Sequence, residues 1–150
     1  MLLEIIHSRE VAAVFIARVF LGTLFFFQGC DAVFGVKLKG VIEGIKQPLE
    51  KKGVPALFIL LGAYYTSYAE LICGFFLIIC FAKYYALCIL GINLLIASLA
   101  FSIIKPMWDL QFVFPRLILL IFLLIAPPQW DVISVDYFPL LLKFIKSITN

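Results

Sequence analysis

Four long apolar runs dominate this chain of 150 residues, and each run contains one strongly polar residue. The runs cover roughly residues 11–34, 55–82, 84–104 and 109–126. Each is close to the ~20 residues that a helix needs to cross the ~30 Å hydrocarbon core of a bilayer. The sequence therefore predicts an all-α membrane protein, with residues 1–150 forming one domain built as a bundle of four transmembrane helices.

The overall composition excludes a soluble domain and a nucleic-acid-binding protein. Hydrophobic residues make up 65% of the chain and charged residues only 14%, whereas a soluble domain is about 45–50% apolar and about 25% charged. The net charge of +3 is small, and the lysines gather between the apolar runs without forming a basic patch. The expected partners are the lipid bilayer and either another protein or a second copy of the chain.

Two amphipathic stretches are predicted outside the apolar runs. Between the first two runs, at 35–53, apolar residues recur at helical spacing among lysines and glutamates. This pattern favours an interfacial helix on the membrane surface, kinked or divided at Pro48; a solvated loop is the alternative. The tail from Tyr137 predicts a second, C-terminal interfacial helix. Four crossings would place both termini on one side of the membrane. The positively charged residues are divided too evenly between the two sides to fix which side this is.

One polar residue lies inside each apolar run. These residues are Arg18, Glu70, Asn93 and Arg116. Counted from the side that would hold both termini, they lie at depths of roughly 10 to 18 Å at 1.5 Å per residue. A charged group at such depth is costly and is expected to face the protein interior and to have a partner. We therefore expect the four residues to form one polar cluster.

Two interpretations of this cluster remain open. It is structural if Glu70 pairs with one or both arginines and Asn93 forms a hydrogen bond across the bundle. It is a binding site if the surplus positive charge, two arginines against one glutamate, attracts a carboxylate, a phosphate or a quinone that becomes anionic on reduction. The candidate lining of such a pocket is Gln28, Tyr64, Tyr65 and Tyr68.

No catalytic or metal-binding constellation is evident in the sequence. The only histidine, His7, precedes the first run, which excludes a membrane haem held by two histidines. The four cysteines form no CxxC motif and are expected to be buried, inert thiols. The sequence therefore predicts no metal and no cofactor other than a quinone as a candidate. We do not expect the chain to be an enzyme on its own.

Several short motifs, in order along the chain, resemble those of one known family. They are Arg18-Val-Phe-Leu-Gly22, Gly53-Val54-Pro55, Ala69-Glu70-Leu71-Ile72-Cys73-Gly74, the basic Lys83 before the third helix, and the closing stretch APPQWDVISVD at 126–136. Together they resemble the DoxX family of small bacterial membrane proteins. The chain also departs from that family, because Gln28 and Ala32 stand where a histidine and a lysine are common, and Ala126 and Pro128 replace the closing glycines.

The resemblance implies a four-helix, multi-pass protein of the bacterial inner membrane. The family takes its name from a subunit linked to thiosulfate:quinone oxidoreduction. The resemblance therefore implies an accessory, quinone-facing subunit of a membrane redox system. One alternative is an assembly or chaperone partner of another membrane protein, with a purely structural polar cluster. A small-molecule carrier is a further alternative, and with so few helices it would need an oligomer.

Overall fold

The structure is a computed structural model that describes residues 9–104 and 110–131. Every regular element within these two ranges is helical, and none is a strand. The elements are α2 (Arg9–Cys30), the π-helical turn η1 (Asp31–Gly35), α3 (Lys37–Glu50), α4 (Ala56–Ile79), α5 (Lys83–Ile104), α6 (Leu110–Ile125) and the 3-10 turn η2 (Pro128–Trp130). His7, the predicted turn at 105–109 and the predicted tail helix from Tyr137 lie outside the described residues.

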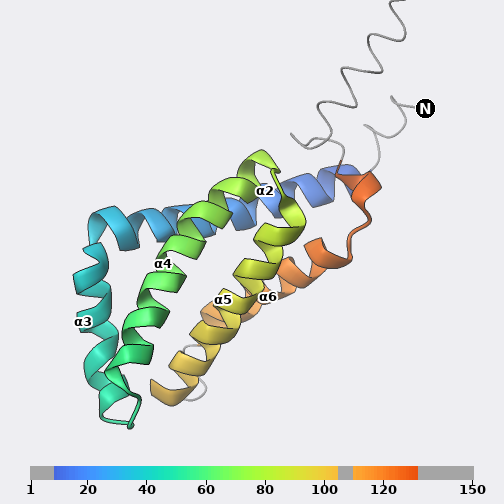
Figure 1. Cartoon of the computed structure of the whole chain (residues 1–150). Helices are drawn as coiled ribbons and strands as arrows, with labels where there is room; N and C mark the ends of the chain where they lie inside the picture. The colour runs from blue at the N-terminus through green and yellow to red at the C-terminus, as the bar shows by residue number, and fades with distance from the viewer. Residues whose placement is uncertain (1–8, 105–109, 132–150) are drawn as a thin grey trace, which may run out of the picture.

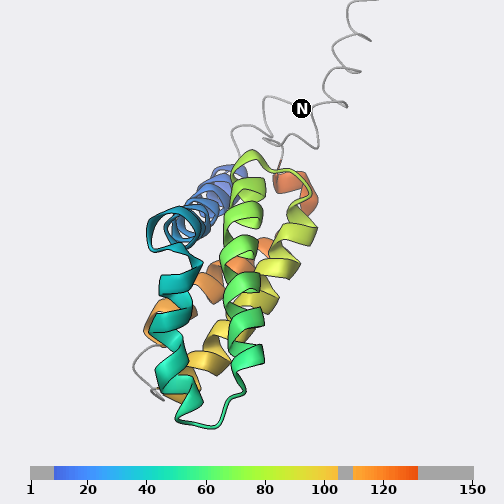
Figure 2. The same ribbon diagram turned by 60° about the vertical axis from the view of Figure 1, so that its left-hand side comes forward.

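Four helices pack into a closed ring. α2 contacts α4, α4 contacts α5, α5 contacts α6, and α6 returns to contact α2. The start of α2, the α4–α5 turn and η2 lie together at one end of the bundle, which we call the η2 end (Figure 1). The remaining helix, α3, turns away from α2 at the opposite end and packs against α4 (Figure 2). We call this opposite end the α3 end.

Within the described ranges, three segments are long and apolar enough to cross a membrane. They are Arg9–Gly35, Ala56–Ile79 and Lys83–Ile104. α6 has 16 residues, and its apolar part is Val113–Ile125. At 1.5 Å per residue it is about 24 Å long, shorter than the ~30 Å hydrocarbon core. The prediction of an all-α, multi-pass membrane protein is confirmed, whereas a fourth crossing by α6 stays a prediction.

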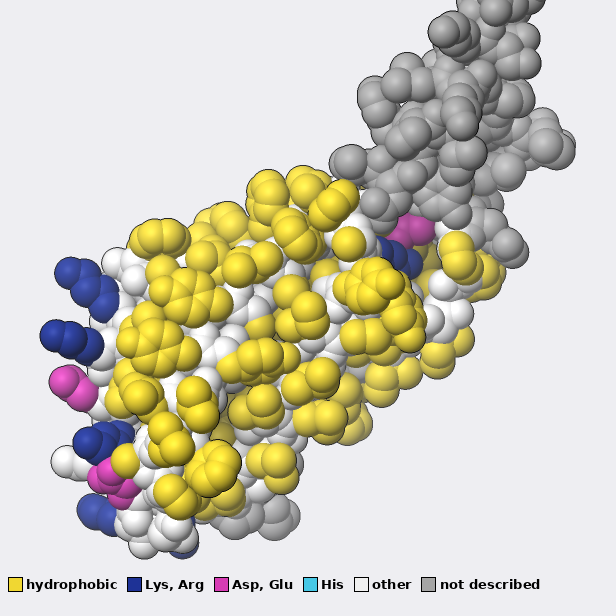
Figure 3. All heavy atoms as spheres, viewed as in Figure 1, with side chains coloured by type: hydrophobic (Ala, Val, Ile, Leu, Met, Phe, Trp, Pro, Cys, Tyr) yellow, Lys and Arg dark blue, Asp and Glu magenta, His cyan; other side chains and the backbone are white. Residues whose placement is uncertain are grey.

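The surface separates apolar from charged side chains. Hydrophobic side chains cover the lateral face of the bundle in Figure 3, and charged side chains gather at the α3 end. Large apolar residues such as Phe27, Phe58 and Leu99 are more than half exposed. A soluble protein rarely exposes so large an apolar surface, but in a membrane protein this surface contacts lipid.

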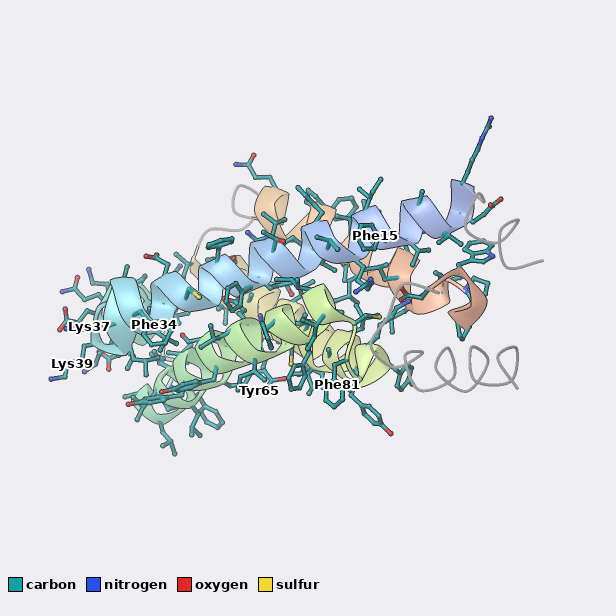
Figure 4. All side chains as sticks on the ribbon, turned by 90° about the horizontal axis from the view of Figure 1, so that it is seen from above. Phe15, Phe34, Lys37, Lys39, Tyr65 and Phe81 are labelled. Atoms are coloured by element: carbon teal, nitrogen blue, oxygen red, sulfur yellow. The ribbon has the colours of Figure 1, made fainter. Side chains whose placement is uncertain are left out.

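The segment predicted to be interfacial is helical over Lys37–Glu50, so the alternative of a solvated loop is wrong for these residues. Its lysines are exposed and Leu49 is buried. Lys37 and Lys39 project at the α3 end, far from Phe81 at the other end (Figure 4). Pro48 was expected to kink or divide the helix, but it lies in the last turn, two residues before the helix ends. Its missing N–H therefore does not interrupt the rest of α3.

The closest helix pair is α2 and α4, and glycines allow the approach. A Cβ atom at Gly29 would lie 2.3 Å from the backbone nitrogen of Leu71, and one at Gly74 would lie 2.5 Å from that of Phe26. No side chain fits at such distances, so the two backbones are in direct contact. Gly74 closes the motif that begins at Ala69. Small residues at a membrane helix interface commonly permit this kind of packing.

Candidate functional site

Glu70 lies on α4 in the interior of the bundle and is 7% exposed. Two amide groups donate hydrogen bonds to its Oε1 atom: Asn93 Nδ2 on α5 at 2.9 Å and Gln28 Nε2 on α2 at 3.3 Å. On α6, Arg116 donates a hydrogen bond to Gln28 Oε1. Gln28, Glu70, Asn93 and Arg116 therefore form a chain of polar contacts with one residue from each of the four packed helices. We call it the central cluster.

The helix packing explains why Gln28 reaches Glu70. Gly29 places the backbone of α2 against that of α4 at Leu71, one residue after Glu70. Gln28, the residue before Gly29, is therefore held beside the carboxylate. The Gln28 amide donates to Glu70 through Nε2 and accepts from Arg116 through Oε1.

Two members of the central cluster have unused hydrogen-bonding capacity. Asn93 is fully buried, and its Oδ1 atom accepts no hydrogen bond from any residue that the structure describes. The Arg116 guanidinium lies over the Phe25 ring, 5.6 Å from the centroid. Within the described ranges its one hydrogen bond goes to Gln28, although a guanidinium has five N–H donors. Gln28 and Arg116 are both accessible at the surface, exposed and half-buried respectively.

Arg18, the fourth residue expected in this cluster, lies elsewhere. Its Nε atom is 3.2 Å from Asp131 Oδ1. Its Nη1 atom donates to the carbonyl oxygens of Leu77 at 2.8 Å and Ile78 at 3.1 Å. These carbonyls belong to the last turn of α4, where the helix dipole favours a cation. Leu77 is seven residues beyond Glu70, which is about 10 Å along the helix axis.

The same carboxylate holds a second cation. Lys83 Nζ at the start of α5 is 2.8 Å from Asp131 Oδ2, and Cys80 Sγ donates to that oxygen at 3.5 Å. Arg18 and Asp131 are almost fully buried. We call Arg18, Cys80, Lys83 and Asp131 the end cluster, because they lie at the η2 end of the bundle.

Cys80 enters the end cluster as a neutral thiol. It occupies the turn between α4 and α5, in the left-handed region with φ 53°. Burial raises its pKa to about 11, and the nearby Asp131 carboxylate acts in the same direction, while Arg18 opposes them. The thiol therefore stays protonated at neutral pH and can donate to Asp131.

Sequence reasoning missed the part played by Asp131 in the end cluster. The predicted topology does indicate this contact, because it places Arg18, the turn at Lys83 and the segment after α6 toward the same side of the membrane. Asp131 is the first acidic residue after α6.

The three tyrosines expected to line a pocket lie apart from the central cluster. They line a shallow groove of about 430 Å³ with Ala69, Ile72, Cys73 and Ile89, and Gln28 is not part of it. Tyr65 donates from its hydroxyl to the Ile89 carbonyl at 3.1 Å. The rings of Tyr64 and Tyr68 are stacked, with centroids 6.4 Å apart. The groove lies between α4 and α5 on the outer surface.

A comparison with family models finds that the DoxX model matches residues 13–103, more than half of the chain. The chain belongs to the DoxX family. It is thus a DoxX-like integral membrane protein. The matched range includes Arg18, Gln28, Glu70 and Asn93, whereas Arg116 and Asp131 lie after its end. Neither a curated protein nor a solved structure matches the chain.

Proposed function

We propose that this DoxX protein is an accessory subunit of a membrane redox system, and that its central cluster faces a quinone. In this proposal α6 is the fourth crossing, both termini lie on one side of a bacterial inner membrane, and α3 lies on the membrane surface. The quinone head would approach from the side where Gln28 and Arg116 are accessible.

The observation that supports this proposal is the position of Arg116. It lies in the middle of an apolar helix, is accessible at the surface, and has one hydrogen bond within the described ranges. A guanidinium at such a depth is costly unless its charge is compensated or its donors have acceptors. A quinone supplies carbonyl oxygens as acceptors, and its reduced forms can carry the negative charge that an arginine stabilises.

The rest of the central cluster suits the same ligand. Reduction of a quinone to a quinol takes up two electrons, which the redox partner would supply, and two protons. Glu70 is the ionisable group linked to Arg116 through Gln28, so it is placed to exchange a proton with the head group. The Oδ1 atom of Asn93, which accepts no hydrogen bond from the described residues, offers an acceptor for a quinol hydroxyl inside the bundle.

The second candidate function is an assembly or chaperone partner of another membrane protein. The same observation supports it, because a polar residue on a partner helix could satisfy Arg116 in place of a ligand. Hydrogen bonds between membrane helices use polar side chains in this way. The two functions differ in whether a small molecule or a protein accompanies the purified chain.

The test is quinone binding to native protein and to Arg116→Gln. Arg9→Gln is a matched control, because it removes the same charge from an exposed position at the start of α2. We expect a short-tail benzoquinone to bind about tenfold more weakly to Arg116→Gln than to the native protein, because the variant loses one charge-assisted hydrogen bond. Arg9→Gln should bind as the native protein does.

Equal quinone binding to native protein and Arg116→Gln would contradict the proposal, as would absence of binding to both. A protein that co-purifies with the native chain but not with Arg116→Gln, with no quinone in the lipid extract, would favour the assembly partner. The melting temperatures of all variants in detergent must agree within a few degrees, so that binding is compared between folded proteins.

A further inference from the structure

A second cavity, separate from the central cluster, opens at the η2 end of the bundle. Its volume is about 420 Å³, and it lies between the first turns of α5 and the last turns of α6. Lys83 and Asp131 of the end cluster form its charged part. The rest of the lining is mainly apolar and includes Leu87, Leu124 and Ile125.

Lys83 has hydrogen-bonding capacity directed at this cavity. Its ammonium group has three donors, and one of them is used by Asp131 within the part of the chain that is described. The Lys83 side chain is 15% exposed, compared with 5% for Asp131. Because Lys83 is the first residue of α5, the helix dipole adds positive potential at the same place.

The Asp131 carboxylate is already occupied by its neighbours. Oδ1 lies 3.2 Å from Arg18, and Oδ2 interacts with both Lys83 and Cys80. One carboxylate is therefore shared between two cations. An incoming anion can bind the remaining donors of Lys83 without displacing Asp131.

The apolar part of the cavity points to an amphiphile as the anion. Leu124 and Ile125 are 39% and 76% exposed, and both lie at the end of an apolar helix. If α6 crosses the membrane, this end would lie where acyl chains meet headgroups. A soluble anion would leave this surface uncovered. A zwitterionic lipid would bring its own cation close to Lys83, which is unfavourable at short range.

We propose that this cavity binds an anionic phospholipid, with the phosphate at Lys83 and the start of an acyl chain against the end of α6. The site would anchor the η2 end of the bundle at one membrane surface. This inference does not depend on the quinone proposal, because the two sites share no residue.

The experiment is native mass spectrometry of delipidated protein titrated with phosphatidylglycerol and with phosphatidylcholine of the same acyl chains. We expect native protein to bind phosphatidylglycerol about tenfold more tightly than phosphatidylcholine. This factor corresponds to the free energy of one charge-assisted hydrogen bond. Lys83→Gln should lose this preference, and Lys83→Arg should keep it. Lys39→Gln, which removes an exposed lysine at the α3 end, controls for general attraction to anionic lipid.

Equal affinity of the native protein for the two lipids would overturn the proposal, and this comparison needs no variant that could fail to fold. Loss of the preference in both Lys83→Gln and Lys39→Gln would assign it to surface charge and would also overturn it. Inorganic phosphate is the third probe. If it displaces phosphatidylglycerol at equal concentration, the cavity binds a free anion and the lipid assignment is wrong.

Discussion

The central cluster and the end cluster both bury charge between apolar helices, but they satisfy it differently. In the end cluster, Asp131 contacts Arg18 and Lys83 directly, at 3.2 and 2.8 Å. In the central cluster, Glu70 accepts hydrogen bonds from two neutral amides, and the hydrogen-bonded path from Arg116 to Glu70 runs through Gln28. The end cluster is a compact ion triad, whereas the central cluster is an open chain with unused donors and acceptors.

The position along the bundle explains this difference. At the η2 end, residues in turns and beyond the helix ends can fold back over Arg18, and Asp131 and Cys80 do so. In the middle of the bundle, only side chains of the facing helices are available. We therefore expect the end cluster to contribute more to stability than the central cluster, whereas the central cluster is the candidate site for a ligand.

The largest effect is expected from removing the shared carboxylate. Asp131→Leu would remove the carboxylate that Arg18 and Lys83 share as a counter-charge. Breaking a buried ion pair costs on the order of 3–5 kcal/mol in soluble proteins. We expect a strongly lowered melting temperature in detergent. Asp31→Leu, at an exposed carboxylate near the α3 end, is the control; similar melting of both variants would show that Asp131 does not stabilise the fold.

Gly29→Ala should disturb the central cluster while leaving the end cluster in place. The added methyl group would meet the α4 backbone at Leu71 and push Gln28 away from Glu70. Overpacking of this kind costs about 1–3 kcal/mol. Gly62→Ala is the matched control, because a Cβ atom there meets nothing within 4 Å. If Gly29→Ala melts at the same temperature as Gly62→Ala, the described contact between α2 and α4 is wrong.

Substitutions of Glu70 should have smaller effects than Asp131→Leu. Glu70→Gln keeps an oxygen that can accept from Asn93 and Gln28, so it should melt close to the native protein. Glu70→Leu loses both hydrogen bonds, each worth about 0.6 kcal/mol on average between membrane helices. The expected order of melting temperatures in detergent is native, Gln, then Leu. A Leu variant as stable as the native protein would mean that these hydrogen bonds add nothing.

The smallest effect is expected at Cys80, and it depends on pH. Cys80→Ala removes one weak S–H donor, so stability at pH 7 should change little. The pKa of Cys80 is raised in the folded state to about 11 from an ordinary value of 9.0. Its contribution is therefore present below about pH 9 and is lost as the pH rises toward 11. The melting temperature of the native protein should fall relative to that of Cys80→Ala over this interval, and parallel curves would contradict the assignment.

The sequence predicts the helices well because their signal is local. Long apolar runs required no knowledge of the partner helices, and the observed helices begin and end within about four residues of the expected bounds. The grouping of Arg18 with Glu70 rested on approximate depth alone. The predicted depths of Arg18 and Glu70 differ by about five residues, roughly 8 Å along a helix axis, and depth alone does not show whether the two side chains meet.

The actual partners depend on helix rotation and on segments beyond the apolar runs. The contact between Gln28 and Glu70 follows from the rotation that brings Gly29 onto Leu71, and hydropathy does not report rotation. The sequence did not identify Asp131 as a partner of Arg18, because it lies outside every apolar run. A carboxylate in such a position needs no buried partner. The family motifs include Glu70 and Lys83 but do not indicate which charged side chains these residues contact.

The central claim is that Arg18 is paired with Asp131 and is energetically separate from Glu70. A pair of double-mutant cycles tests it most directly, with Arg18→Gln combined first with Asp131→Asn and then with Glu70→Gln, by equilibrium unfolding in detergent. We predict a coupling of at least about 1 kcal/mol for Arg18 with Asp131 and less than about 0.5 kcal/mol for Arg18 with Glu70. A strong coupling of Arg18 to Glu70, with none to Asp131, would contradict the division into two clusters.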